Sequence, residues 1–307
     1  MTVYGLLSAL ALALMLAVAL KNTRFDVWIR LSVTAIPLAL IGSRLLFGLT
    51  SLAMGDMTHP LQILYVWDGG ASMSGAFAGV VLAAFLVERH CKVPHGILMD
   101  NLALGMPLAL VVARLAEIPT GVGMGRQVDT PWLQWLGALN EECHPVFIYE
   151  ALWAVIIGIA LMLYLRRNRQ PGDLLLTFMT LYGSAQMFFE SLRDDYHMVI
   201  YYIRINQIAG LIMVLIPFII WLVRLSKHGA KRNELIFPCA VMAVAIVLCI
   251  YQEFQVDSNP NLLKEYALMA AGVAVMGAQT ILIGIKADLA LKEHLANKYN
   301  LMPPLGK

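Results

Sequence analysis

The chain has 307 residues, of which 60% are hydrophobic and only 14% are charged, whereas soluble domains carry about 25% charged residues, so an ordinary soluble fold is excluded. The net charge of +2 gives no indication of nucleic-acid binding, and the basic residues form no block larger than a loop-sized cluster, so we expect no nucleic-acid partner. The four cysteines form neither a Cys-x-x-Cys pair nor a metal-ligand spacing with histidine, so we expect no disulfide framework, no metal site and no cofactor.

Nine apolar segments follow one another along the chain, and each approaches the roughly 20 residues that a membrane-spanning helix needs. They predict an all-α fold: a polytopic transmembrane helical bundle of about nine spans. The first segment has no preceding basic region and no convincing cleavage site, so we expect a retained helix rather than a signal peptide. The segments are residues 3–20, 31–53, 71–87, 96–114, 146–165, 174–192, 205–223, 235–251 and 266–285.

Positive charge is distributed unevenly between the loops that connect these segments. With the N-terminus outside, 16 of the 22 lysines and arginines fall on the inner side. Because cytoplasmic loops are enriched in Lys and Arg, we expect the N-terminus outside and the C-terminus inside. The cations left over on the outer half or within the spans are Arg44, Arg114, Arg126, Arg193, Arg204 and Lys264.

Four of these arginines need an explanation, because an ionisable group in a span costs roughly 2.5–3.5 kcal/mol or more. Arg44, Arg114, Arg126 and Arg193 either pair with nearby carboxylates or bind an anion such as a lipid phosphate, which suits the guanidinium group. The sequence leaves both interpretations open. The carboxylates available for pairing are Asp68, Glu117, Asp129 and Glu190.

The outer loop at 115–144 is rich in Gly, Pro and Trp, and we expect it to form a small cap or re-entrant element. Trp132 and Trp135 suit the membrane interface.

A polar stripe crosses the sixth segment. Tyr182, Gln186, Glu190 and Arg193 recur at helical spacing and therefore share one helix face. A polar face is costly against lipid, so we expect it to line the bundle interior. It is either a functional site or a structural network in which Glu190 pairs with Arg193.

Several stretches resemble the prolipoprotein diacylglyceryl transferase family over roughly residues 1–225. They are the Trp67-Asp-Gly-Gly turn and the following Ser72-to-Gly79 segment, the run from Arg114 to Arg126 with Asp129-Thr-Pro-Trp132 after it, His144-Pro with Tyr149-Glu150-Ala, and the helix from Tyr182 to Arg193. They occur in the family's order. The resemblance implies seven family-like spans in a domain of residues 1–228, with two additional spans and a short cytoplasmic tail in residues 229–307.

The resemblance also implies a reaction. In this family a diacylglyceryl group moves from phosphatidylglycerol to a cysteine thiol of a lipoprotein precursor, and glycerol 1-phosphate leaves. Such a site must hold a phosphate in a water-poor environment and must help to form a thiolate. The implied phospholipid-binding residues are Gly70, Arg114, Gly121, Gly125, Arg126, Glu190 and Arg193.

The chain departs from the family pattern at informative positions. Ser74 replaces a family histidine, Glu117 an asparagine, and Gln186 an arginine of the late helix; Thr120, Val122 and Phe147 replace three further polar residues. We take Tyr182, Ser74, Glu117 and Gln186 as the candidate catalytic side chains.

Each of these candidates has a second interpretation. Glu117 lies one turn after Arg114, where it either pairs with that arginine or acts as a base. Ser74 borders a small-xxx-small pattern that also fits close helix packing. His144 is the nearest other base in the sequence, but the family carries it too, which favours a structural role.

Two hypotheses therefore stand. The first is an active, phospholipid-dependent transferase of the bacterial cytoplasmic membrane, using phosphatidylglycerol or a related anionic phospholipid and a lipoprotein precursor or another membrane protein. The second is a catalytically altered paralog that binds phospholipid or a protein partner without standard transfer activity. A transporter is disfavoured because no inverted repeat is evident.

Overall fold

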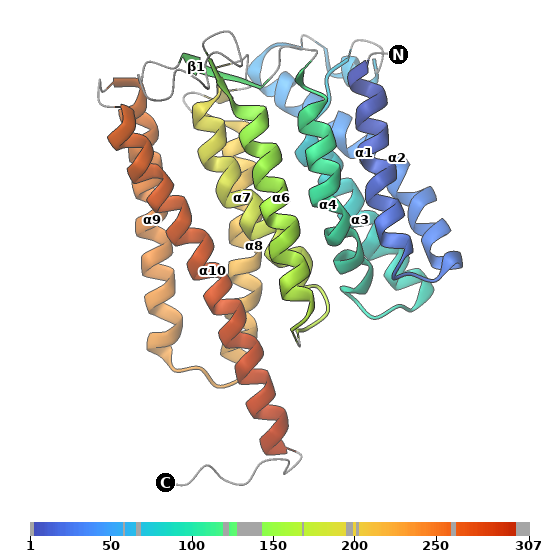
Figure 1. Ribbon diagram of the computed structural model, residues 1–307, viewed down its shortest axis with the longest axis vertical. Coiled ribbons are helices and arrows are strands. Elements are labelled where there is room, and N and C mark those ends of the chain that lie inside the picture. Colours follow the sequence, from blue (N-terminus) through green and yellow to red (C-terminus); the bar gives the residue numbers. More distant parts are fainter. Residues whose placement is uncertain are drawn as a thin grey trace. The chain divides into compact units, whose positions relative to one another are not determined.

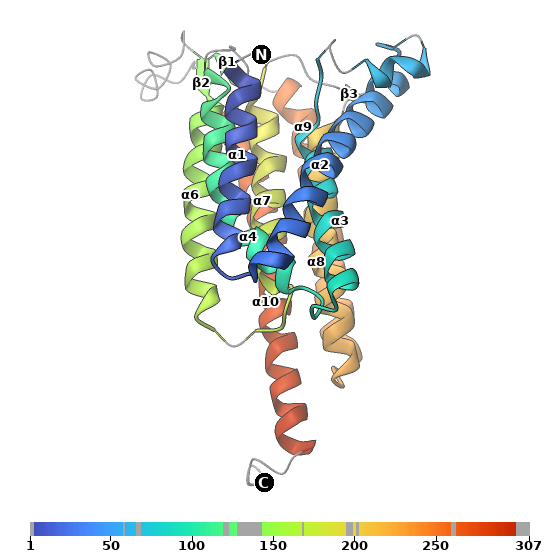
Figure 2. The same cartoon turned by 90° about the vertical axis from the view of Figure 1, so that its right-hand side faces the viewer.

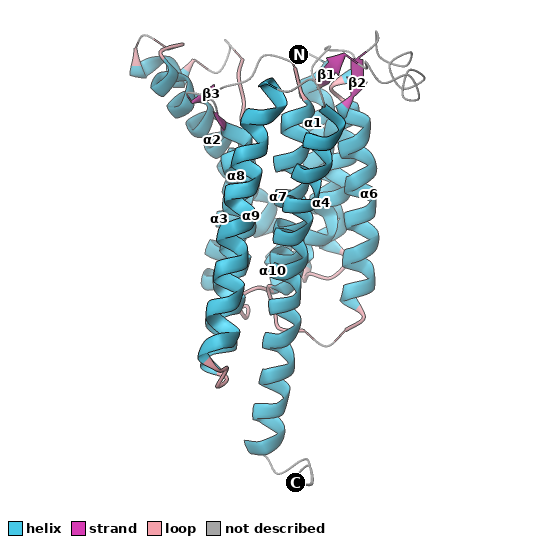
Figure 3. Cartoon of the chain, turned by 90° about the vertical axis from the view of Figure 1, so that its left-hand side faces the viewer, coloured by secondary structure: helices cyan, strands magenta, loops and turns pink. Residues whose placement is uncertain are grey.

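The computed structural model describes residues 3–57, 59–65, 69–118, 123–127, 143–167, 169–194, 199–200, 203–258 and 262–298. These ranges contain nine α-helices, and Figure 3 shows that helices dominate the molecule. The predicted all-α architecture is therefore confirmed. The helices are α1 (Val3–Leu20), α2 (Phe25–Met54), α3 (Met73–Cys91), α4 (Ile97–Leu115), α6 (Val146–Leu165), α7 (Asp173–Leu192), α8 (Ile205–Lys227), α9 (Arg232–Ser258) and α10 (Leu262–Lys298).

Each of the nine apolar segments predicted from the sequence coincides with one of these helices. Seven of the helices in the described residues are long and apolar enough to cross a membrane, namely α2, α3, α4, α6, α8, α9 and α10. The apolar part of α1 is shorter, at Gly5–Leu20, and α7 carries the polar stripe. The number of crossings beyond seven and the orientation stay predictions.

The chain forms two compact units. The first comprises residues 1–178 and 189–209, and the second comprises residues 179–188 and 210–307. The middle of α7 and most of α8 thus belong with α9 and α10. The boundary at residue 228 expected from the family resemblance stays a prediction.

In the first unit, α1 packs on α4, α4 packs on α6, and α2 packs on α3 (Figures 1 and 2). Four short strands lie in the connections between the helices, in the parts of these connections that the structure describes. Figure 2 places β1 and β2 at the end of this unit where α1 begins. The strands are β1 (Met124–Gln127) antiparallel to β2 (Cys143–Pro145), and β3 (Val199–Ile200) antiparallel to β4 (Ile203–Arg204); a short 3-10 helix, η1 (Pro60–Leu64), follows α2.

Glycine permits the close approach of α2 and α3. A Cβ atom at Gly42 would lie 2.5 Å from the carbonyl oxygen of Gly75, and one at Gly79 would overlap the backbone of Leu38. Within lipid the hydrophobic effect does not bring helices together, because the surrounding lipid tails are as apolar as the helix surface. Helices there associate instead through close packing at small residues. The packing interpretation of the segment that follows Ser74 is therefore confirmed for Gly75 and Gly79.

Two buried carboxylates accept hydrogen bonds from the first N–H groups of helices at the end of the first unit that is opposite to β1 and β2. The Glu88 side chain accepts hydrogen bonds from the backbone N–H groups of Gly96 and Leu98, at 3.0 and 2.8 Å, at the start of α4. Asp100 accepts from Leu174 N at 2.9 Å at the start of α7. The first N–H groups of a helix have no partner within it, and a carboxylate there also favours the helix dipole. Asp100, buried in a span, is thus a helix cap.

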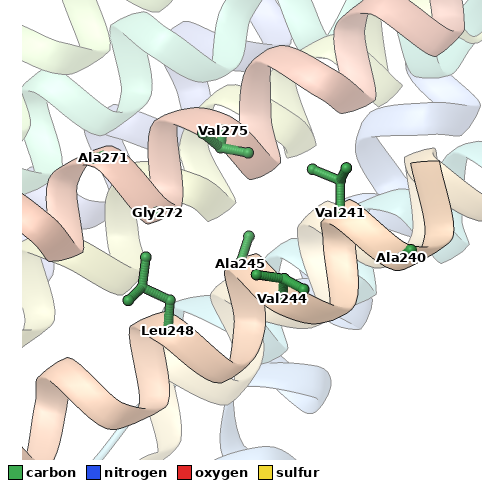
Figure 4. Close-up of a pocket in the computed structure, with 8 residues that line it drawn as sticks. All are labelled: Ala240, Val241, Val244, Ala245, Leu248, Ala271, Gly272 and Val275. Carbon is green, nitrogen blue, oxygen red and sulfur yellow. The ribbon is translucent and has the colours of Figure 1, made fainter. Parts of the chain in front are cut away.

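In the second unit, α9 and α10 pack as an antiparallel pair with a groove of ≈ 340 Å³ between them (Figure 4). Every residue that lines the groove is small or aliphatic, so it offers no group for phosphate or thiol chemistry. The lining residues are Ala240, Val241, Val244, Ala245, Leu248, Ala271, Gly272 and Val275.

We expect Gly79→Leu to lower the free energy of unfolding in detergent by about 1–3 kcal/mol, because overpacking forces α2 and α3 apart. Thermal or chemical unfolding of the purified protein measures this change. Ala78→Leu is the matched control, because Ala78 is the exposed neighbour of Gly79 on the same helix and should cost much less. Equal stability of the two variants would contradict the close contact.

Candidate active site

Four charged side chains from three separate segments meet at the end of the first unit where β1 lies. Arg114 is in the last turn of α4, Glu117 lies two residues beyond that helix, and Glu150 is near the start of α6. Arg193 is the residue that ends α7. We call these four residues the arginine–glutamate cluster. Arg114 and Arg193 therefore share one environment, as a common anion site requires.

The two arginines are joined through the two carboxylates. Arg114 Nη1 lies 2.5 Å from Glu117 Oε1, and Arg114 Nε lies 2.5 Å from Glu150 Oε2. Arg193 contacts the same two partners at longer range, since its Nη2 and Nη1 atoms lie 3.8 Å from Glu117 Oε2 and Glu150 Oε2. Each carboxylate thus bridges both guanidinium groups.

The cluster is almost completely shielded from solvent. The exposed fractions of its four residues lie between 3% and 5%. Breaking a buried pair by removing one partner typically costs 3–5 kcal/mol, because the other charge is left uncompensated. The formal charges of the cluster sum to zero, which makes its burial in an apolar bundle tolerable.

The backbone of residues 123–125, where β1 begins, lies close to Glu117 and Arg193. Gly125 pairs with Arg193 in an isolated antiparallel bridge, and Asp194 N donates to Met124 O at 3.0 Å. Gly123 has a φ of +85°, and a Cβ atom there would lie 2.6 Å from Glu117 Oε2. Glycine is favoured where φ is positive and where a backbone must come this close to another group.

The end of α7 is fixed by a further arginine. Arg204 Nη1 donates to the carbonyl oxygens of Glu190 and Arg193, both at 2.6 Å. Asn206 Nδ2 donates to Glu190 Oε1 at 3.1 Å. The last carbonyls of a helix lack partners within it, and a cation placed there satisfies them. Arg204 thereby holds the segment that carries Arg193.

Comparison with known proteins agrees with this geometry. The family model described as prolipoprotein diacylglyceryl transferase matches residues 1–223. The chain belongs to this family. It is 29% identical over 235 residues to the phosphatidylglycerol–prolipoprotein diacylglyceryl transferase of Clostridioides difficile (strain 630), covering 75% of this chain and 92% of that relative.

Two further relatives carry the same name. The protein of Bacillus velezensis is 25% identical over 224 residues, covering 69% of this chain and 82% of the relative. The protein of Geobacter sulfurreducens is 33% identical over 157 residues, covering 50% of this chain and 60% of the relative. The chain is therefore a multi-pass member of a transferase family whose relatives are named for phosphatidylglycerol and prolipoprotein.

Ser74 and Arg126 both belong to the first unit. Ser74 is half-buried in the first turn of α3, and the sulfur of its neighbour Met73 lies 3.9 Å from Arg114 Nη2. Arg126 is half-buried in β1, next to Gly125.

The other predicted site residues of the transferase are more dispersed. Tyr182 and Gln186 belong to the second unit, about two turns and one turn before Glu190 on α7; Tyr182 is half-buried and Gln186 is buried. Gly121 lies outside the described residues, as do Trp132 and Trp135. Gly70 has a φ of +80° and lies in the loop between η1 and α3.

Arg44 has a structural role that the sequence did not reveal. Its guanidinium donates to the backbone carbonyls of Gln62, Ile63, Tyr65, Gly69 and Gly70, and it lies over the Phe47 ring at 5.5 Å. An arginine side chain has five N–H donors, so the loop uses all of them. The five carbonyl groups satisfy the Arg44 guanidinium, so it needs neither of the two partners considered from the sequence, a carboxylate or a bound anion.

Glu150, Arg204 and Asn206 are the residues that sequence reasoning left out of the site. Glu150 had a usable signal, because it follows Tyr149 in a family motif and is a carboxylate in an apolar segment. Tyr149 itself lies with its Oη 3.1 Å from His144 Nδ1, which agrees with a structural role for His144. Arg204 and Asn206 reach the end of α7 because the chain reverses at β3 and β4. Hydropathy does not indicate this reversal.

Arg44→Lys should loosen the loop that follows α2. A lysine ammonium has three donors and no planar fork, so it cannot replace five carbonyl contacts. We expect hydrogen–deuterium exchange of the backbone amides in residues 61–65 and 69–72 to accelerate about tenfold or more, as loss of roughly 1.4 kcal/mol of local stability would produce.

Arg24→Lys is the matched control for this experiment. Arg24 is exposed and contacts Asp26 on the surface, where such pairs contribute little, so the exchange of residues 61–65 and 69–72 should not change. Unaltered exchange in Arg44→Lys would contradict the role given to Arg44.

Proposed function

We propose that this chain transfers the diacylglyceryl group of a phospholipid, phosphatidylglycerol as in its named relatives, to the thiol of a cysteine in a lipoprotein precursor. The thiol gives its proton to water, the sulfur bonds to the terminal carbon of the diacylglyceryl group, and the bond from that carbon to the phosphate oxygen breaks. Glycerol phosphate then leaves with the electron pair. We propose that this takes place in a bacterial cytoplasmic membrane with the N-terminus outside.

The observation that carries the proposal is the convergence of Arg114 and Arg193. Two buried guanidinium groups within reach of the same carboxylates are suited to bind the oxygens of one phosphate. Negative charge grows on that phosphate as the bond to carbon breaks, and a fixed cation in a water-poor site stabilises it. Arg126, Gly125, Gly121, Gly70 and Glu190 are proposed to complete the headgroup site.

The proposed catalytic side chains are Ser74, Glu117, Tyr182 and Gln186. Serine does not act as a base near neutral pH without help, and glutamine carries no charge. We therefore propose that the chain as it stands transfers slowly, and that its pocket is still built for the reaction. Ser74 follows Met73, which contacts Arg114 at 3.9 Å, and we propose that a histidine in place of Ser74 would supply the missing base.

Ser74→His combined with Gln186→Arg should raise the rate of transfer from phosphatidylglycerol to a lipobox peptide about 100-fold, within the range that one general base contributes. Mass spectrometry of the peptide in detergent measures the diacylglyceryl thioether. Adding Arg114→Gln should lower this rate about 100-fold or more, whereas Arg24→Gln should not affect it.

Two results would contradict the proposal. One is a double variant that folds as the unmodified protein does but gains no transfer. The other is a rate that survives Arg114→Gln, because the phosphate would then be bound elsewhere.

A further inference from the structure

The Glu117 carboxylate lies between the guanidinium groups of Arg114 and Arg193. One of its oxygens lies 2.5 Å from Arg114 Nη1, and the other lies 3.8 Å from Arg193 Nη2. A phosphate that uses both guanidinium groups would present two of its oxygens in the same way. The two anions therefore compete for the same donors.

We propose that Glu117 is a built-in competitor for phosphate: it holds the anion position between Arg114 and Arg193 and must move aside when a phosphate ester binds. This inference rests on the proposed function, since it concerns the same phosphate site. Glu117 would thereby set the affinity of the site for the phospholipid headgroup and for the glycerol phosphate that leaves.

Glu117 is better placed than Glu150 to move. Glu117 lies in the turn beyond the last residue of α4, and its backbone is tied to the helix by the bond from its N–H to Arg114 O at 3.1 Å. Glu150 lies within α6, where the helix fixes its backbone. Release of Arg114 requires the Glu117 side chain to turn away from the backbone of Gly123, which approaches its Oε2 atom closely, while Glu150 continues to hold that arginine at 2.5 Å.

Charge balance gives the expected consequence. With both carboxylates in place the cluster is neutral, so a phosphate gains little attraction until Glu117 gives up Arg114. Without the Glu117 charge the cluster is positive by one unit, and a phosphate diester restores neutrality. Removal of this charge should therefore tighten the binding of phosphate esters, and return of the carboxylate should help to expel the product.

The test uses short-chain phosphatidylglycerol as the probe, titrated into the purified full-length protein in detergent and followed by calorimetry. We expect Glu117→Gln to bind the probe on the order of tenfold more tightly than the unmodified protein, as changes at close charge pairs typically produce. Glu117→Asp keeps the charge and should bind the probe as the unmodified protein does. Arg114→Gln should lose binding.

Asp194→Asn is the matched control. It removes one negative charge next to Arg193 in sequence, but its side chain is exposed, so the affinity should not change. If Glu117→Gln does not fold, Glu117→Asn replaces it, because the family signature carries asparagine at this position. The same tightening is then expected.

Unchanged or weaker binding by the folded Glu117 variant, with binding still lost in Arg114→Gln, would overturn the competitor role and leave the proposed function intact. Equal tightening in Asp194→Asn would also overturn it, because net charge alone would then explain the effect. Binding that survives Arg114→Gln would instead remove the phosphate site on which the proposed function depends.

Discussion

The pair between Arg114 and Glu150 is the interaction on which the rest of the site depends. It joins the end of α4 to the start of α6 at 2.5 Å in an environment from which solvent is excluded. Neither charge is tolerable there alone, because an isolated buried ion costs several kcal/mol. The pair therefore fixes the position of Arg114, and Glu117 and Arg193 are arranged around it.

Carboxylates serve two different purposes at the two ends of the first unit. Glu88 and Asp100 accept hydrogen bonds from the N–H groups that begin α4 and α7, which have no partner within those helices; the cation near Asp100 lies farther off, with Arg169 Nε 3.9 Å from Asp100 Oδ2. Glu117 and Glu150 instead face guanidinium groups, which are the donors that a phosphate would need. Burial of an acid in a span is thus not sufficient evidence for a functional site, and the identity of its partner decides.

Sequence patterns predicted the helices well and the loop contacts poorly. Each of the nine apolar segments became a helix because hydropathy acts over about 20 neighbouring residues. The contact between Arg114 and Glu117 was predictable because the two residues are three apart at a helix end. The contacts of Arg44 and Arg204 were not, because their carbonyl partners lie 11 to 26 positions away, in loops and at helix ends that side-chain type does not specify. The cap that Asp100 provides was equally unpredictable, because the helix that it caps starts 73 residues later.

A double-mutant cycle at Arg114 and Glu150 tests most directly the claim that buried pairing of opposite charges builds this site. The free energy of unfolding in detergent would be measured for Arg114→Gln, Glu150→Gln and the double variant. We expect the two changes to be coupled by at least about 1.5 kcal/mol, as close charge pairs are. Additive effects within roughly 0.5 kcal/mol would show that the two side chains act independently, and would contradict the account.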